Sequence, residues 1–582
     1  MRRNALFALL IAAVATTGSE TAAQDPSVTP QQVSPGSVLG IVRQAQVSGA
    51  AGAWDEAARL WAQAIEQNPV QPAWWYSLGE ARSRARDYAN AIPAFERAAA
   101  LGAPLMGGYY AVYEVARCYA LAGDTQRGVE ALQRAFRLGF PDVRQAIRDP
   151  DLAALRRDSR VIEMLGLQDV SAMSRDDGWR YDLTLFAREA HRKGFNTHLS
   201  VSRPVTREGF DAKVRDIRDA IPRLSDGQLV LEFIKLARFL EDGHSEVLWD
   251  FGDNPLLQPT LPLAFFWFDD GLFVTATDPE HRDLLGAQVL QVDDLPVQDV
   301  LDATSPYINV DRGNPMMVRA KAPYALRKTA VLHAAGLVRS PDRVTLAIRD
   351  LSGDTRDVVV HADSTEPDIW NKLPAPSGWE TLTSTLTPAP LYVQHTDKPQ
   401  WFEYLPDQKT VYFQFNKVRD GADESFLRFT TRLSAFIDSN DVDRVVIDMR
   451  WNNGGNTSAA HPLLLSLISN KKVNQRGRLF VIIGRRTLSA AQNMATYFER
   501  YTNAIFVGEP TGSSPNFIGE EVPLTLPYSK LIANVSHLFW QSSWPQDQRV
   551  WLPPHIYVPP RFADLRAGRD AALDVILAAP RR

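Results

Sequence analysis

The chain has 582 residues, a formal net charge of −5 and a sequence pI near 6.1. Hydrophobic residues make up 45% and charged residues 23%, a composition typical of a globular chain long enough for three or four domains. The mildly acidic balance argues against a nucleic-acid or anionic-membrane partner, since both attract basic surfaces. Neither Cys-x-x-Cys nor His-Glu-x-x-His occurs, so we expect no metal site and no cofactor.

Residues 1–23 have the pattern of a secretory signal peptide. Two arginines precede an apolar run from Ala5 to Ala15, and small residues at Thr21 to Ala23 form a cleavage site. The run is too short to cross a bilayer, so we expect no stable membrane span and a periplasmic or secreted protein. An uncleaved anchor is the alternative. The only cysteine, Cys118, lies in a helical apolar pattern, and export without disulfides suits a bacterial periplasm.

A Pro- and Ser-rich stretch at 24–38 predicts a linker, and repeats follow over 39–168. The pattern from Trp54 to Ala64 recurs from Tyr88 to Ala98 and, with a short insertion before it, from Thr125 to Ala135. Small residues where helices cross and one large aromatic plug resemble the tetratricopeptide repeat, which implies an all-α solenoid. Its role is either to bind a protein partner or to act as a spacer packed on the rest of the chain.

Residues 171–250 continue the helical periodicity, and 258–365 change to the alternation of strands. The runs from Asp270 to Ala276 and from Leu285 to Val297 resemble strands of a PDZ domain. A helical insert at 301–340 is longer than usual for that fold. A PDZ-like domain here would either bind peptide ends by strand addition or serve a structural role alone.

From about 400 to 582, short apolar strands alternate with helices, which predicts an α/β sheet with its loops at the carboxyl ends of the strands. The expected strands are 411–415, 445–447, 479–483 and 504–507, and the expected helices are 424–439, 459–468 and 490–500.

Ser489 is the first of three chemical motifs. It follows the strand ending at Ile483 and opens a helix, where backbone N–H groups and the helix dipole favour negative charge. This placement suits a nucleophile whose attack creates an oxyanion. An ordinary N-cap serine is the alternative interpretation.

The second motif is Arg450-Trp-Asn-Asn-Gly454-Gly455, where glycines let backbone N–H groups approach a ligand. The third is Asp242-Gly-His244-Ser245. Together with a Val507-Gly-Glu-Pro-Thr-Gly512 segment, these motifs resemble, in order, those of the C-terminal processing (tail-specific) serine peptidase family.

That resemblance implies a crotonase-like α/β peptidase core. One branch of the family uses a Ser-Lys dyad with the lysine just after the segment that ends at Gly512, but the first lysine after Gly512 is Lys530. The resemblance therefore implies the Ser/His branch, which is similar to the core of tricorn protease. It makes Ser489 the nucleophile and His244 its base. Ser245 would bridge His244 to an acid, Asp547.

The oxyanion hole would combine the N–H of Ala490 with that of Gly454 or Gly455. His461 is the rival base. Glu521 and the neighbouring Gln548 are the alternatives at the acid position. Asp448 and Arg450 are expected to brace the glycine turn rather than to react.

The sequence thus predicts an exported serine endopeptidase that cleaves unfolded or C-terminal protein segments. One alternative is a catalytically inactive peptide- or ligand-binding protein on the same fold. The other is a scaffold protein whose tetratricopeptide repeats are the functional part.

Overall fold

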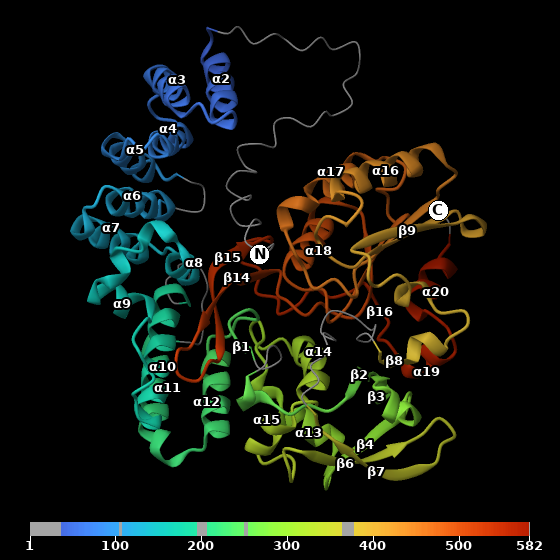
Figure 1. The fold of residues 1–582 in the computed structure, drawn as a ribbon. Helices are drawn as coiled ribbons and strands as arrows, with labels where there is room; N and C mark the ends of the chain where they lie inside the picture. The colour runs from blue at the N-terminus through green and yellow to red at the C-terminus, as the bar shows by residue number, and fades with distance from the viewer. Residues whose placement is uncertain (1–35, 104–107, 195–205, 249–253, 364–377, 581–582) are drawn as a thin grey trace. The chain divides into compact units, whose positions relative to one another are not determined.

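The computed structural model describes residues 36–103, 108–194, 206–248, 254–363 and 378–580 (Figure 1). The expected signal peptide and most of the expected linker lie outside the described residues. The chain divides into two compact units, Met1–Phe140 with Pro150–Val161, and Pro141–Asp149 with Ile162–Arg582.

The smaller unit is helical, and each of its helices packs on the next along the chain. The helices are α2 (Val38–Ala50), α3 (Trp54–Gln67), α4 (Pro72–Arg84), α5 (Tyr88–Ala100), α6 (Tyr109–Leu121) and α7 (Thr125–Arg137). Small residues allow their close approach: a Cβ atom at Gly79 would lie only 2.7 Å from the Phe95 ring. Cys118 is buried and is a free thiol rather than part of a disulfide. The assignment of these helices to the tetratricopeptide family stays a prediction.

α9 (Ser159–Leu165) crosses the sequence boundary between the two units at Val161, and other helices form the first part of the larger unit. They are α8 (Val143–Arg148), α10 (Arg175–Glu189), α11 (Arg207–Ala220) and α12 (Asp226–Arg238), with a π-helical turn at Ala190–Gly194. Ser225 starts α12 with a capping box, which satisfies the first backbone donors of the helix. The segment that carries His244 follows the end of this helix.

An antiparallel sheet follows, in the order β2-β3-β4-β6-β7. Its elements are β2 (Leu263–Phe268), β3 (Gly271–Thr277), β4 (Gln288–Val292), β5 (Leu295–Pro296), β6 (Arg343–Arg349), β7 (Thr355–His361) and β8 (Glu380–Thr381). The helical insert expected at 301–340 contains α14 (Pro315–Ala325) and α15 (Thr329–Ala334), and α13 (Val297–Ala303) begins before it. The PDZ-like assignment of this sheet stays a prediction.

The C-terminal sheet has the order β16-β13-β12-β11-β10-β9 and is parallel except at β9. Its strands are β9 (Gln400–Leu405), β10 (Thr410–Phe415), β11 (Arg444–Asp448), β12 (Leu479–Ile483), β13 (Ile505–Gly508) and β16 (Ile556–Tyr557). The helices are α16 (Phe426–Ser439), α17 (His461–Ser469), α18 (Ala490–Tyr501), α19 (Phe562–Arg566) and α20 (Ala571–Ala578). The strands and helices expected between 411 and 507 are therefore present.

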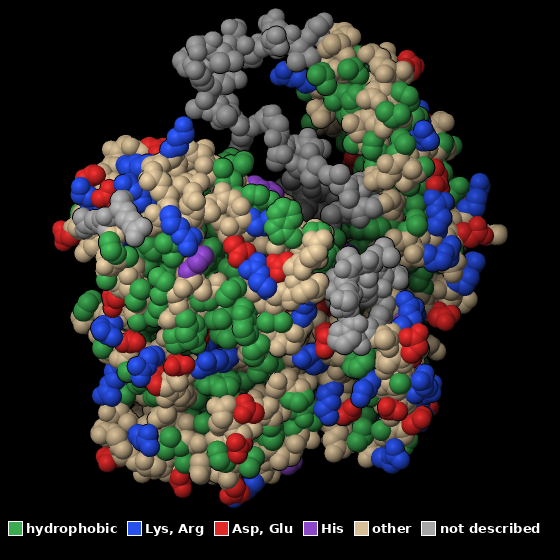
Figure 2. All heavy atoms as spheres, turned by 180° about the vertical axis from the view of Figure 1, so that it is seen from behind, with side chains coloured by type: hydrophobic (Ala, Val, Ile, Leu, Met, Phe, Trp, Pro, Cys, Tyr) green, Lys and Arg blue, Asp and Glu red, His purple; other side chains and the backbone are tan. Residues whose placement is uncertain are grey.

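Apolar side chains fill both sides of this sheet, with α16, α17 and α18 over one face and α20 over the other. A third sheet, β1 (Val247–Leu248), β15 (Ile532–Gln541) and β14 (Asn516–Thr525), brings the segment after His244 beside the chain that follows β13. On the face shown in Figure 2, basic and acidic side chains are interspersed and apolar side chains gather near the middle.

Candidate active site

Ser489 lies between β12 and α18, at the N-cap position of the helix. Its backbone adopts φ 54° and ψ −128°, a conformation that costs a residue with a side chain about 1–3 kcal/mol. The half-buried side chain makes no capping hydrogen bond. Its hydroxyl is therefore not used as an ordinary helix cap and is left available for chemistry.

The loop that carries Ser489 is fastened to the end of β11. The Thr487 hydroxyl donates to the Met449 carbonyl at 3.0 Å and accepts from the Gly484 N–H at 3.1 Å. The Leu488 N–H donates to the Asn452 carbonyl at 3.1 Å. These bonds bring the loop after β12 against the glycine turn after β11, as expected for neighbouring parallel strands.

Close packing explains why glycine occupies both positions of that turn. At Gly454, with φ 103°, a Cβ atom would lie 2.7 Å from the Ser489 Cβ and 3.0 Å from the Ala490 nitrogen. At Gly455, with φ 142°, it would lie 2.1 Å from the Val418 carbonyl oxygen. The structure thus brings together the predicted nucleophile and all three residues predicted for the oxyanion hole.

Their N–H groups are not equivalent. The Gly454 N–H donates to Asn452 Oδ1 at 3.0 Å. The N–H groups of Gly455 and Ala490 make no hydrogen bond to any described residue. A pair of uncommitted backbone donors beside a hydroxyl, one of them at the positive end of a helix, can stabilise an oxygen that becomes negative.

His244 lies in the loop after α12. Its N–H donates to Asp242 Oδ1 at 3.0 Å, and its ring stacks on Phe517 of β14 with centroids 5.4 Å apart. Ring atom Nδ1 is buried and has no hydrogen-bond partner among the described residues. The imidazole therefore has a fixed plane but no acceptor that selects its tautomer.

Several charged side chains act on this imidazole. Burial alone would lower the pKa of His244, but the carboxylates of Glu521, Asp311 and Asp242 outweigh burial and hold the pKa above its ordinary value. Lys321 opposes them more weakly. An imidazole whose protonated form is favoured in this way can accept a proton from a hydroxyl.

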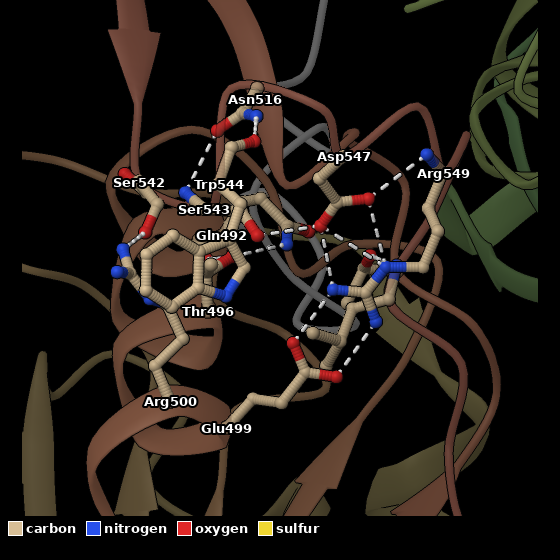
Figure 3. Close-up of polar contacts among 12 residues, drawn as sticks. Gln492, Thr496, Glu499, Arg500, Asn516, Ser542, Ser543, Trp544, Asp547 and Arg549 are labelled. Carbon is tan, nitrogen blue, oxygen red and sulfur yellow. Dashed lines mark hydrogen bonds and ion pairs between the residues drawn. The ribbon is translucent and has the colours of Figure 1, made fainter.

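Asp547 belongs to a different cluster (Figure 3). It accepts hydrogen bonds from the Ser543 hydroxyl at 2.6 Å and from Arg549 Nε at 3.0 Å, and Arg549 also pairs with Glu499 at 2.7 Å. Burial alone would raise the pKa of Asp547, but these two hydrogen-bond donors lower it to about 2. The carboxylate is thus ionised at neutral pH and committed to its own arginine.

The Ser245 hydroxyl accepts the N–H of Ser536 on β15 at 2.9 Å. It makes no hydrogen bond with Asp547 or His244, so the structure does not join these three residues into a relay. The acid at Asp547 and the bridge at Ser245 remain predictions. His461, the rival base, starts α17 and stacks on Tyr497.

Arg450 links the glycine turn to the C-terminal helix. Its guanidinium bonds Asp448 at 3.1 Å and both oxygens of Asp570 at 3.0 and 2.8 Å. Asp448 also accepts the Tyr412 hydroxyl at 2.7 Å. These buried groups satisfy one another, which agrees with a bracing role.

Three contacts of the site were not found from sequence. Asn452, which orients the Gly454 N–H, is visible in hindsight as the asparagine two positions before the glycine pair. Phe517 and Asp311 had no motif, because each reaches His244 from a distant segment.

Among the described residues, no helix is both long and apolar enough to cross a membrane. No protein-family model and no curated protein sequence matches this chain. Solved structures with a similar arrangement include mature CPAF complexed with lactacystin, with 14% identity, a TM-score of 0.46, and 69% of this chain and 97% of that chain covered.

Another is the photosystem II D1 C-terminal processing protease, with 11% identity, a TM-score of 0.32, and 68% of this chain and 98% of that chain covered. A third is the tricorn protease, with 12% identity, a TM-score of 0.31, and 68% of this chain and 36% of that chain covered. At 11–14% identity and TM-scores of 0.31–0.46, these are likenesses of arrangement alone.

Proposed function

We propose that this chain is a serine peptidase that hydrolyses peptide bonds through an acyl-enzyme on Ser489. The observation that carries the proposal is the Ser489 hydroxyl itself. Ser489 has a strained backbone conformation, and its hydroxyl is not used as a helix cap. The uncommitted N–H groups are those of Ala490, the next residue, and of Gly455, in the turn whose Gly454 packs against Ser489. Strain of this kind persists only where surrounding structure enforces it, and it concentrates at reactive sites.

In this mechanism His244 removes the Ser489 hydroxyl proton as the oxygen attacks the scissile carbonyl carbon. The carbonyl oxygen becomes negative and is held by the N–H groups of Ala490 and Gly455. The carbon–nitrogen bond then breaks, and His244 gives its proton to the leaving amine. Water, deprotonated by the same imidazole, releases the acyl group.

The substrate class of the proposal is protein or peptide, with unfolded or C-terminal segments as preferred targets. This choice rests on the motif resemblance, as do periplasmic or secreted localisation, the PDZ-like domain, and a protein partner at the tetratricopeptide-like helices. Each is a separate part of the proposal, and none affects the chemistry at Ser489.

The test is covalent labelling. A fluorophosphonate, which reacts with activated serines, should label the wild-type chain and should not label Ser489→Ala. Ser458→Ala is the matched control, because Ser458 is an exposed hydroxyl just after the same glycine turn and should leave labelling and casein hydrolysis unchanged. Equal labelling of Ser489→Ala and wild type would exclude Ser489 as the nucleophile.

A second candidate function is a non-catalytic peptide- or ligand-binding protein. It is favoured by one observation: His244 Nδ1 has no hydrogen-bond acceptor among the described residues, so no carboxylate orients the base directly. A folded wild-type chain that binds peptides but takes up no label would support this candidate.

A further inference from the structure

The segment between Ile308 and Asn314 joins parts of the chain that are far apart in sequence. It precedes α14, within the helical insert of the PDZ-like sheet. Asn309 Nδ2 donates to the Ser245 carbonyl. Asn314 Nδ2 donates to the carbonyls of Thr511 at 3.0 Å and Val550 at 2.8 Å. One short loop thus holds the His244 segment, the chain after β13 and the chain after β15.

Asp311 is the charged member of this loop and is only 2% exposed. Its Oδ1 accepts the Gly243 N–H at 2.7 Å, and its Oδ2 accepts the Ser514 N–H at 3.3 Å. Both oxygens are therefore fixed, and one is bonded to the residue directly before His244. A buried carboxylate needs hydrogen bonds and a compensating positive charge.

We propose that Asp311 is the positioning carboxylate of His244: it fixes the loop that carries the imidazole and stabilises the imidazolium formed when Ser489 gives up its proton. This inference rests on the proposed function, because it assigns His244 as the base. It gives the orienting role to a residue of the PDZ-like insert instead of the C-terminal segment around Asp547.

Other charged groups that face His244 are less suited to this role. Asp242 uses one oxygen for the N–H groups of its own loop and for the Ser536 hydroxyl. Glu520 and Glu521 on β14 are exposed, and neither accepts a hydrogen bond from the described part of the loop that carries His244, although Glu521 is the carboxylate that raises the pKa of His244 most. Lys321, on α14, has the opposite sign and pairs with Glu246 at 2.6 Å.

The charges acting on Asp311 support the assignment. Burial raises the pKa of Asp311, and the positive form of His244 is the largest charge that lowers it. The reverse effect appears at His244, whose pKa Asp311 raises. Each group thus favours the charged form of the other, while burial keeps the pKa of Asp311 above its ordinary value.

The test compares pH profiles of kcat/KM for Asp311→Asn, Glu521→Gln and Asp547→Asn on a short peptide. Asp311→Asn should lower the plateau about 100-fold or more and move the acid-limb midpoint down by about one pH unit. Asp547→Asn should leave the midpoint within a few tenths of a unit of wild type. Glu521→Gln should lower the midpoint, because Glu521 also raises the pKa of His244, but with a much smaller loss of plateau than Asp311→Asn, since Glu521 holds no part of the His244 loop.

A matched control separates positioning from structure. Asp182 is also a fully buried carboxylate that accepts two backbone N–H groups, from Tyr528 at 2.9 Å and Ser529 at 2.7 Å. Asp182→Asn should reduce stability without moving the acid limb. If Asp311→Asn lowers activity while keeping the wild-type midpoint, as Asp182→Asn is expected to do, the inference is wrong.

The titration of His244 can also be measured without substrate turnover, which separates the proposed peptidase activity from the proposed pairing of Asp311 with His244. In protein labelled with ¹³C-histidine, the NMR titration midpoint of His244 should fall by about one unit in Asp311→Asn. Absence of fluorophosphonate labelling in the wild type, combined with this fall, would reject the peptidase and retain the pairing. Normal labelling with an unchanged His244 midpoint would reject the pairing alone.

Discussion

Replacement of Gly454 by alanine tests the geometry of the site most directly. The new Cβ atom would lie 2.7 Å from the Ser489 Cβ, 3.0 Å from the Ala490 nitrogen and 3.0 Å from the Leu488 carbonyl oxygen. Carbon atoms in contact normally stand about 3.5–4.0 Å apart, so the methyl group must push Ser489 away by about 1 Å. The obstructing atoms are backbone or Cβ atoms, which cannot swing aside as a long side chain can.

A displacement of about 1 Å between reacting groups lowers a rate by about 100-fold, equivalent to about 2.7 kcal/mol of barrier. We therefore expect kcat/KM of Gly454→Ala to fall at least about 100-fold, measured on a short peptide after the midpoint of thermal unfolding has been recorded.

The matched control is Gly477→Ala. Gly477 also has a positive φ, 87°, and stands before β12, at the opposite end of the strand from Ser489, with nothing within 4 Å of its Cβ position. It should lose about 1 kcal/mol of stability through backbone strain and keep its activity. Wild-type turnover in Gly454→Ala, or an equal loss of turnover in both variants, would refute this account of the glycine turn.

Three further predictions follow from described contacts. Because the pKa of His244 is held above its ordinary value and catalysis needs the neutral imidazole, kcat/KM should fall with decreasing pH through a midpoint above about 6.5; a flat profile from pH 5 to 8 would exclude His244 as base. Because the pKa of Asp547 is lowered to about 2, this carboxylate stabilises the fold above about pH 4, and the stabilisation is lost as pH falls toward 2. The free energy of unfolding of Asp547→Asn, measured by chemical denaturation, should therefore fall less between about pH 4 and about pH 2 than that of wild type. Gly79→Ala would place a methyl group 2.7 Å from the Phe95 ring, so it should destabilise the smaller unit by about 1–3 kcal/mol, measured by denaturant unfolding, while fluorophosphonate labelling of Ser489 stays at the wild-type level.

The strands and the start of α18 could be predicted because they depend on local sequence. A run such as Leu479–Ile483 is wholly apolar and is followed by glycine, which identifies a buried parallel strand without any tertiary information. Ser489 was found for the same reason, since its position between strand and helix is local. Its positive φ was not predictable, because neighbouring backbone enforces it.

The surroundings of His244 could not be predicted, since they come from several distant segments. Phe517 lies on β14, far from His244 in sequence. Asp311 lies in the helical insert, and the only unusual feature of that insert in the sequence is its length. The pairing of Asp547 with Arg549, two residues later, was local and could have been considered. A family motif identifies which residue stands at a position in the chain. The direction in which its side chain points depends on the hydrogen-bond partner that it reaches in the fold.

The loop from Ile308 to Asn314 has a consequence for when the chain can act. It forms hydrogen bonds with Thr511, Ser514 and Val550, which lie about 200 residues or more further along the chain and are therefore synthesised much later. On the proposed function, an incomplete or still unfolded chain holds the histidine and its carboxylate but cannot align them with Ser489. The alignment of the histidine segment therefore depends on folding of the C-terminal part of the chain.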